Sequence, residues 1–359
     1  MLMIIQPGIW KSTPEGSLGR FSSQTFLTTI SVVTLLLLSA AASPVFAAAP
    51  NIGWSATGGG ALFYTDDAAL FSATRRSSLD GDPSQPVLDV SRTGIGKDMV
   101  FEPYVRLSKL IPSRWGETEF SVRVRGFTYA VNPEFSHSSI YLEALHGFTP
   151  RAILRFRYFT SPDQLLGQTE VHGSDQIQDM RVTSHLGTVR FDYRLSDHWE
   201  LQLLGRAGIR NFNDTFVQRD TLLWRIGPHL LYHLNHHAKI ILGYHYERGL
   251  AEGRHDTHLG DDASYVHHFG SIGLEADLME HLELELDFHF ERNNFTTGIH
   301  ADERFGGHEN IYIGSGRLSY QVTDHTAVFV VVQRSNREIS FHHTHDFNTN
   351  VSLGAIYRF

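Results

Sequence analysis

The amino-acid sequence predicts an all-β protein, a transmembrane antiparallel up-and-down β-barrel of about fourteen strands. Three observations support this fold class. The last eleven residues alternate between mostly apolar and mostly polar side chains and finish on the aromatic Phe359. Segments of the same character recur along the chain, separated in turn by short and long connections. After the N-terminal region, no apolar run reaches the roughly 18 residues of a membrane-spanning helix.

The composition agrees with an exported barrel. The chain has 359 residues, no cysteine, 31 glycines, 24 phenylalanines and 13 tyrosines. The absence of cysteine fits passage through an oxidising compartment without a disulfide framework. The formal net charge of −9, without any basic tract, gives no support for a nucleic-acid partner.

Residues 1–48 are predicted to be a cleaved signal peptide, which leaves residues 49–359 as the barrel domain. Two basic residues precede an apolar run over residues 27–42, and a segment of small residues follows directly. This order is typical of a secretory signal, with cleavage expected after Ala47 or Ala49. A retained membrane anchor is the alternative, and the shortness of the run disfavours it.

Fourteen strands are expected in the mature chain, because alternation recurs in segments of about ten to fifteen residues. They are predicted over residues 52–64, 98–110, 117–130, 137–147, 151–160, 180–195, 198–211, 221–234, 238–248, 264–278, 281–291, 310–322, 325–335 and 347–359.

The connections between these strands alternate in length. Short ones carry polar turn formers, as in Ser196-Asp197 and Asn235-His236. Long ones, including 65–97 and 161–179, are rich in Asp, Asn, Gly and Ser. A closed barrel of fourteen strands needs six short turns and seven long loops, which is the number found. Whether the first long loop folds into the lumen is left open by the sequence.

Segment 281–291 illustrates the two faces of a barrel strand. Its even positions, from Leu282 to Phe290, are all leucine or phenylalanine, and its odd positions are acidic or histidine. Lipid outside and water inside satisfy both faces, since a charge facing lipid near the midplane costs up to about 2–4 kcal/mol.

The same alternation, applied to every strand, predicts two walls of opposite charge in the lumen. The basic wall consists of Arg106, Arg123, Arg125, Arg155, Arg157, Arg190, Arg194, Arg206, Arg210 and Arg225. The acidic wall consists of Glu247, Glu275, Asp277, Glu283, Glu285, Asp287 and Glu291. Such a transverse field can orient polar or charged solutes in a wet pore. Alternatively, the opposite charges pair and plug the lumen, since fourteen strands lie between filled and open barrels.

No cofactor, metal or catalytic centre is expected. Histidines and aspartates gather in the loops around His255–Asp262 and His342–Asp346, but without a defined four-ligand spacing they fit solvent-facing loops better than a metal site. Ser184 and His185 are candidate hydrolase residues, yet the G-x-S-x-G elbow is missing. We therefore expect that the protein is not an enzyme.

The C-terminal strand resembles the final strand of bacterial outer-membrane proteins. That resemblance implies location in the outer membrane, contact with outer-membrane lipid, and recognition of Tyr357 and Phe359 by the barrel assembly machinery as an assembly signal.

A narrower resemblance covers about 30 residues. Gln333–Asn336, Asp346–Asn350, Leu353-Gly354 and Tyr357–Phe359 look like the ending of a β-barrel porin family that includes outer-membrane proteins of exopolysaccharide loci. It implies a channel that assists polysaccharide export, with no catalytic residues to carry over. The charged lumen and the histidine-rich loops depart from that family.

The expected function is thus an outer-membrane porin that passes polar or charged solutes, with exopolysaccharide export as a specific form of it. The alternative is a structural or surface-interaction barrel with a plugged lumen, whose long extracellular loops bind partners. The sequence does not specify the oligomeric state.

Overall fold

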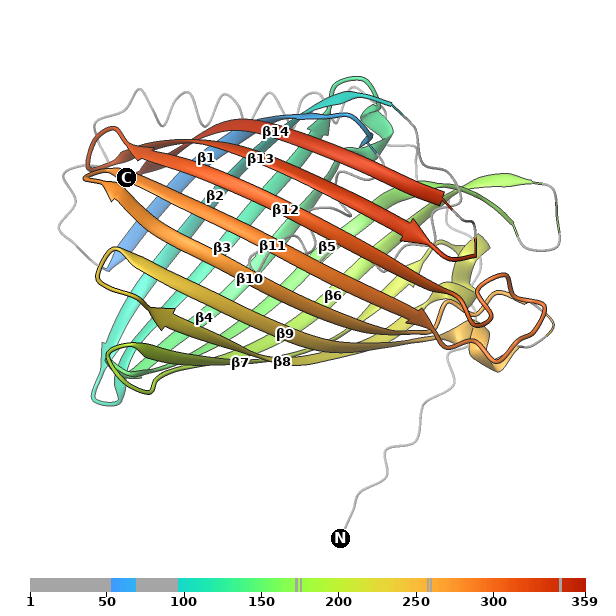
Figure 1. Cartoon of the computed structure of the whole chain (residues 1–359), viewed down its shortest axis with the longest axis horizontal. Coiled ribbons are helices and arrows are strands. Elements are labelled where there is room, and N and C mark those ends of the chain that lie inside the picture. Colours follow the sequence, from blue (N-terminus) through green and yellow to red (C-terminus); the bar gives the residue numbers. More distant parts are fainter. Residues whose placement is uncertain are drawn as a thin grey trace, which may run out of the picture. The chain divides into compact units, whose positions relative to one another are not determined.

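The described part of the chain forms one closed antiparallel barrel (Figure 1). The structure, a computed structural model, describes residues 53–68, 96–171, 174, 176–256, 258, 260–341 and 344–359. Each strand pairs with its neighbours in sequence, and β1 pairs with β14. The predicted fold class is therefore confirmed. The predicted signal peptide, residues 1–48, lies outside the described residues.

The barrel has fourteen strands, as the alternation predicts. The strands are β1 (Trp54–Thr65), β2 (Asp98–Ser113), β3 (Gly116–Tyr129), β4 (His137–Thr149), β5 (Ala152–Glu170), β6 (Ile177–Arg194), β7 (Trp199–Phe212), β8 (Thr221–His233), β9 (Ala238–Ala251), β10 (Tyr265–Met279), β11 (Leu282–Phe295), β12 (His308–Gln321), β13 (Thr326–Ile339) and β14 (Thr344–Arg358). Their bounds differ from the prediction by at most four residues except at the end of β5.

The loop predicted over 161–179 is mostly strand, which corrects the sequence interpretation. Pro162 and its polar neighbours resemble a turn in sequence. In the structure they belong to β5, whose pairing with β6 continues past them with two register shifts. Such bulges let a strand continue past residues that fit a regular ladder poorly. The extension is held by burial of Leu165 and Leu166, which are 4% and 1% exposed.

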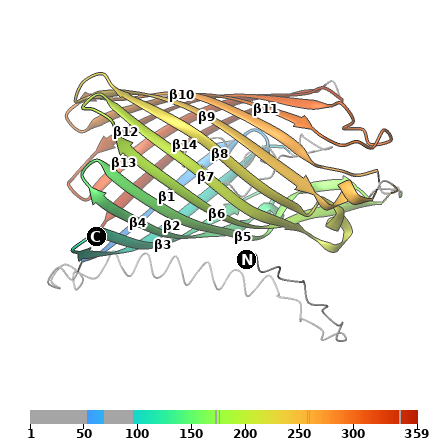
Figure 2. The ribbon, with the colours of Figure 1, turned by 90° about the horizontal axis from the view of Figure 1, so that it is seen from below.

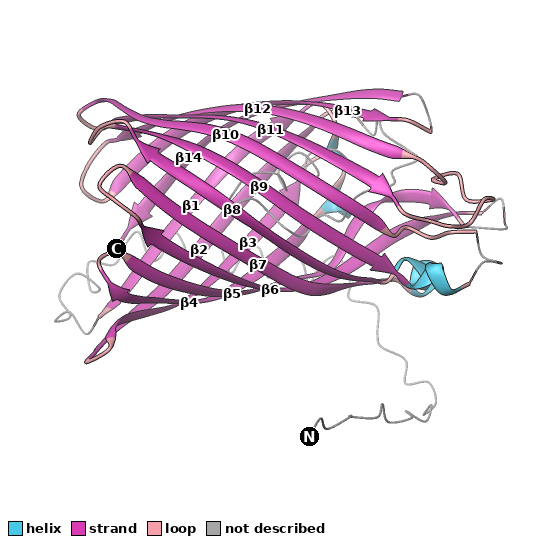
Figure 3. Cartoon of the chain, turned by 60° about the horizontal axis from the view of Figure 1, so that its bottom comes forward, coloured by secondary structure: helices cyan, strands magenta, loops and turns pink. Residues whose placement is uncertain are grey.

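The two ends of the barrel differ in their connections (Figures 1 and 2). Short turns and Phe359 lie at one end, which we call the short-turn end. Three 3-10 helices, η2 (Pro133–Phe135), η3 (Asp214–Arg219) and η4 (Glu252–His255), lie in the longer connections of the other, the long-loop end (Figure 3). No helix in the described part of the chain is long and apolar enough to cross a membrane.

The barrel closes between its first and last strands. The pairing of β1 with β14 runs from Thr57 opposite Arg358 to Thr65 opposite Asn350. The backbone N–H of Phe359 adds a hydrogen bond of 3.0 Å to the Ala56 carbonyl. Because hydrogen bonds join every strand to two others, the sheet has no free edge.

The wall has an apolar outer face and a mostly polar inner face. Outward side chains such as Leu107, Phe156 and Leu353 are 47%, 49% and 67% exposed. Inward positions carry most of the charged residues, many of them buried. An apolar surface that extends around the barrel is unfavourable in water and matches the hydrocarbon of a bilayer.

Apolar side chains also gather inside the barrel. One cluster toward the long-loop end includes Val100, Phe127 and Leu165, and a second includes Met180 and Phe216. The third cluster consists of Tyr141, Phe159, Leu186 and Leu223 on β4, β5, β6 and β8. The third cluster lies on the same face of the sheet as the arginines of β2–β8.

Candidate functional site: the barrel lumen

The residues of the two predicted walls lie on the face of the sheet opposite to the exposed apolar side chains. On β3, for example, Arg123 and Arg125 alternate with Val122 and Val124, whose side chains are 45% and 49% exposed. Because successive strand residues point to opposite faces, exposed valines on the outside put these arginines on the inside.

Three arginines of the basic wall share one carboxylate, Glu143 on β4. Arg157 approaches it most closely, with Nη2 at 2.8 Å and Nε at 2.9 Å. Arg106 Nη2 lies 3.3 Å and Arg155 Nη1 lies 3.8 Å from the same carboxylate. Arg106 also contacts Glu119 at 2.7 Å. The side chains of Glu143 and Arg157 are 10% and 18% exposed, whereas that of Arg106 is 36% exposed, so the Arg157 pair is better shielded from water than the Arg106 pair.

Other arginines of the basic wall have carboxylates of their own. Arg125 Nε lies 3.1 Å from Glu102, and Arg190 Nε lies 2.8 Å from Asp192. Arg194, near a short turn, reaches Asp197 at 3.9 Å.

The basic wall also has an aromatic neighbour. The guanidinium carbon of Arg123 is 4.2 Å from the ring centroid of Tyr141, within cation–π range.

The sequence reasoning missed these carboxylates. Glu102, Glu119, Glu143 and Asp192 occupy the same face as the arginines, and the alternation that located the arginines also locates them. The basic wall is therefore interleaved with acidic residues.

The two predicted walls meet in a buried network across β7–β10. Glu247, assigned to the acidic wall, lies 2.6 Å from Arg225 Nε. Its carboxylate also accepts a 2.6 Å hydrogen bond from the Tyr265 hydroxyl, to which Arg210 donates at 3.4 Å. Arg206, the remaining arginine, donates to Thr188 Oγ1 at 3.1 Å.

Carboxylates predominate on the inner face of β10 and β11 toward the short-turn end. Glu275 lies directly opposite Glu285, and Asp277 opposite Glu283. Like charges in such cross-strand positions repel. Lys239 lies 2.6 Å from Glu275, and Arg317 lies 3.8 Å from Glu285.

Two further members of the acidic wall have different surroundings. Asp287 lies opposite Gly273, where a Cβ would come within 2.7 Å of its Oδ1, so the glycine leaves room for this carboxylate. Glu291 lies closer to the long-loop end, with His267 Nε2 at 3.0 Å.

A row of buried histidines crosses the inner face, and the sequence reasoning did not single it out. The Nε2 atoms of His229 and His245 are 2.5 Å apart. The ring of His245 stacks on that of Phe269 with 5.3 Å between the ring centroids, and Phe269 stacks on His289 with a centroid distance of 5.4 Å. The histidines of the long loops differ, since His255 and His258 are exposed. His342 and His343 lie outside the described residues.

The described residues hold no group of three or more His, Asp or Glu side chains placed to bind a metal ion. The Ser184–His185 pair is not a catalytic pair either. Ser184 is buried on the inner face, whereas His185 lies on the outer face and its Nδ1 is 2.8 Å from the Tyr158 hydroxyl.

A second ionic network joins three long connections at the long-loop end. Arg219 Nε and Arg304 Nη2 each lie 3.0 Å from the carboxylate of Asp261. Arg304 also pairs with Asp302 at 2.8 Å. Burial raises the pKa of the Asp261 carboxyl, but the two arginines outweigh burial and lower that pKa to about 2. Asp261 thus stays ionised and links η3 to the loops that precede β10 and β12.

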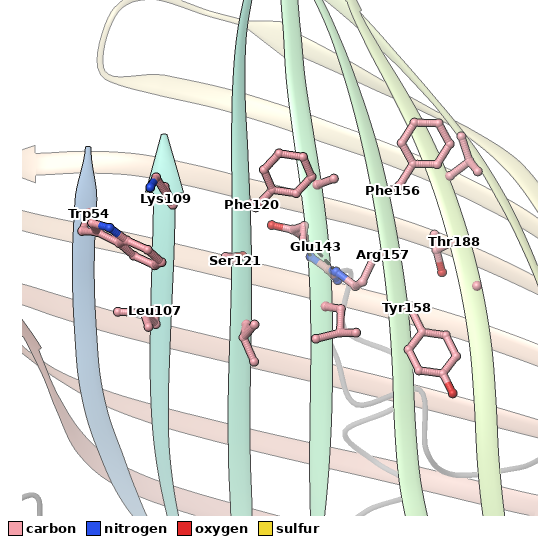
Figure 4. A pocket seen from close by; sticks show the side chains of 15 residues that line it. Trp54, Leu107, Lys109, Phe120, Ser121, Glu143, Phe156, Arg157, Tyr158 and Thr188 are labelled. Atoms are coloured by element: carbon pink, nitrogen blue, oxygen red, sulfur yellow. Dashed lines mark hydrogen bonds and ion pairs between the residues drawn. The ribbon is translucent and has the colours of Figure 1, made fainter. Parts of the chain in front are cut away.

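Two hollows lie on the outer surface of the barrel. The first, of about 670 Å³, is lined by Trp54, Leu107, Phe120, Phe156 and other apolar side chains of β1–β6, with Lys109 beside Trp54 (Figure 4). The second, of about 640 Å³, lies over β9–β13. Both consist mainly of side chains that face lipid.

The predicted assembly residues lie on the outer face at the short-turn end. Tyr357 and Phe359 are 46% and 50% exposed, and their rings pack edge to face at 4.7 Å. Aromatic residues in such positions match the interfacial girdle of a membrane barrel.

No protein-family model and no curated protein matches the sequence. Among solved structures, the fold is similar to the outer membrane channel DcaP of Acinetobacter baumannii, with 10% sequence identity, a TM-score of 0.50, and coverage of 85% of this chain and 96% of that chain. A bacterial polysaccharide outer membrane secretin matches with 8% identity and a TM-score of 0.44, over 84% of this chain and 98% of that chain. An anion-selective porin from Comamonas acidovorans matches with 8% identity and a TM-score of 0.40, over 85% of this chain and 98% of that chain.

At these identities the likeness concerns the fold. The chain has the fold of outer-membrane β-barrels, and its closed sheet and apolar outer face suit a bilayer. The predicted location in the bacterial outer membrane is thereby confirmed.

Proposed function

We propose that the protein is an outer-membrane channel whose charged lumen passes polar or charged solutes. The observation that carries the proposal is the arrangement of charge on the inner face, where arginines on β2–β8 are interleaved with fewer carboxylates and carboxylates predominate on β10 and β11. A field directed across a pore orients dipolar and charged solutes and discriminates among them.

Export of an extracellular polysaccharide is the specific role that we infer for such a channel. It is supported by the resemblance of the C-terminal strands to barrels of exopolysaccharide loci. A sugar ring could pack against the aromatic cluster inside the barrel, where the rings of Tyr141 and Phe159 lie 4.9 Å apart. A hydroxyl-rich polymer would also find hydrogen-bond partners in the arginines and carboxylates beside these rings.

A second function, a closed barrel that acts through its loops, is favoured by the burial of the network across β7–β10. Glu247, Arg210 and His245 are only 2%, 4% and 5% exposed. Side chains this well covered reduce the space available to a solute at their level.

Recording from the purified protein in planar lipid bilayers tests the channel. We expect discrete conductance steps. The size of the steps is expected to change when the cation or the anion of the salt is replaced by another. Export is tested by adding oligosaccharides to one side, where a polymer that enters the lumen interrupts the current. Absence of steps from heat-resistant, folded protein would rule out the channel and leave the closed barrel.

A further inference from the structure

The outer face of alternate strands changes from apolar to cationic toward the long-loop end. On β13, Val328, Val330 and Val332 face outward and are followed by Arg334. The same change occurs on β11 and β9, where Phe290 precedes Arg292 and Tyr246 precedes Arg248. An aromatic girdle followed by polar residues marks the boundary between hydrocarbon and headgroups.

These three arginines have no carboxylate partner among the described residues. Arg292 donates to two neutral amides, Asn294 Oδ1 and Asn310 Oδ1, each at 3.1 Å. Arg334 lies 5.5 Å from the ring centroid of Phe347, and Arg248 is exposed. Their positive charge is therefore available to an external anion.

Arg181 on β6 gives the contrast. It also faces outward toward the long-loop end, but Asp163 and Asp179 lie 3.1 Å and 3.7 Å from its guanidinium. Among the described residues, carboxylates therefore neutralise the outward arginine of β6 but not those of β9, β11 and β13.

The second outer hollow adjoins Arg334. Its apolar lining includes Ile272, Leu286, Phe288 and Val332, and Gly314 lies within it on β12. A Cβ at Gly314 would meet no atom within 4 Å, so the missing side chain leaves open space between neighbouring strands.

We propose that this surface binds a phosphorylated glycolipid of the outer leaflet, of the lipid A type. Arg248, Arg292 and Arg334 receive its phosphates, because guanidinium groups form strong charge-assisted hydrogen bonds with phosphate oxygens. The hollow beside Arg334 receives one of its acyl chains, for which the surrounding apolar side chains are the matching surface.

The spacing of the arginines favours a headgroup with more than one phosphate. They lie on β9, β11 and β13, and four strand spacings cover about 19 Å. One phosphate cannot contact all three side chains across that width, whereas a bisphosphorylated disaccharide presents separated anions. The Tyr244 hydroxyl and His268 Nδ1 lie 2.8 Å apart. His268 lies directly opposite Arg292 in the pairing of β10 with β11, so these two polar groups lie beside that arginine.

Native mass spectrometry of the purified full-length barrel tests this site. The probes are bisphosphorylated lipid A, dephosphorylated lipid A and phosphatidylglycerol, each added at equal concentration. We expect retention of lipid A by the wild-type protein and a loss of at least about tenfold in the triple variant R248Q/R292Q/R334Q, because charge-assisted contacts are removed. Lys109→Gln is the matched control, since Lys109 also adjoins an outer hollow but lies at the short-turn end.

Gly314→Leu tests the acyl-chain part without changing charge. It fills the hollow and is expected to weaken retention of lipid A while the conductance stays as in the wild type. Folding of every variant is checked by heat resistance on a gel, and Gly314→Leu alone decides if the triple variant does not fold. Unchanged retention in the folded variants, an equal loss in Lys109→Gln, or equal retention of phosphatidylglycerol would overturn the proposal.

Discussion

Glu143 shows how a single residue organises charge in the lumen. Its carboxylate lies within 4 Å of Arg106, Arg155 and Arg157, which come from β2 and β5. Replacing it leaves three cations close together around a position where the carboxylate is only 10% exposed, and Arg106 keeps its contact with Glu119. Glu143 therefore sets both local stability and the net charge of this side of the lumen.

Glu143→Gln is expected to destabilise the barrel by about 1–3 kcal/mol, the usual cost of leaving buried partners without their hydrogen bonds. It also removes one negative charge from the lumen, which makes the net charge one unit more positive, so the reversal potential in a salt gradient is expected to shift toward anion selectivity. Chemical unfolding measures the first effect and bilayer recording the second. Glu280→Gln is the control, since that side chain is 91% exposed in a short turn. Equal effects of the two substitutions would contradict this role.

At the same scale, the sequence located individual side chains better than their partners. Alternation assigns each residue of a strand to one face, and it predicts that Arg106 and Arg157 face the lumen, but Glu143 on the same face was not singled out. The three come together because of the pairing register, in which Glu143 lies opposite Arg157. The register is set when neighbouring strands pair, so it cannot be derived from the sequence of one strand alone.

At the scale of elements, three of the long connections pack on one another although their composition suggests solvent-facing loops. Asp261, Arg219 and Arg304 are 3%, 7% and 2% exposed, so the loops that carry them pack on one another. Composition predicts hydrophilic loops, because it counts charges and contains no information about their contacts. The same limitation hid the extension of β5, where Pro162 indicated a turn and Leu165 and Leu166 are buried.

Asp261→Asn is expected to loosen η3 and the loops before β10 and β12 while the strands stay intact. In the native protein the same loosening is expected only in strong acid. The Asp261 pKa of about 2 lies below its ordinary value of 3.8, so the contribution of the ion pairs is complete above 3.8 and is lost as the pH falls to about 2. Limited proteolysis across that range measures loop opening.

Asp214→Asn serves as the control for the loop experiment, because Asp214 is an exposed residue of η3. Cleavage of the Asp261→Asn loops at neutral pH no faster than those of Asp214→Asn would argue against the network.

For the molecule as a whole, the sequence predicted the architecture because a membrane barrel repeats one rule. Each strand alternates between lipid and lumen, and connections alternate between short and long, so local pattern and global fold agree. The interior follows no such rule. The apolar cluster of Tyr141, Phe159, Leu186 and Leu223 joins non-neighbouring strands β6 and β8, and the histidine row spans β8–β11.

Phe359→Ala is expected to lower the amount of folded barrel in the outer membrane, on the hypothesis that Tyr357 and Phe359 form the assembly signal. Heat-resistant protein in outer-membrane fractions measures this amount. Phe347→Ala removes an aromatic side chain with similar exposure, 54% against 50%, from the opposite end of β14 and is the matched control. Unchanged levels of Phe359→Ala would contradict the assembly role.

The pairing of β1 with β14 has a consequence for the order of folding events. Gly60 lies opposite Ala355, so closure joins parts of the chain separated by nearly the entire barrel. Contacts of such long sequence separation form slowly, because the entropy of the intervening chain is lost before they stabilise the product. Until β14 has arrived, β1 presents an unpaired ladder of N–H and C=O groups that is prone to aggregation. The unfinished protein therefore needs to be kept apart from its own copies during transit to the membrane.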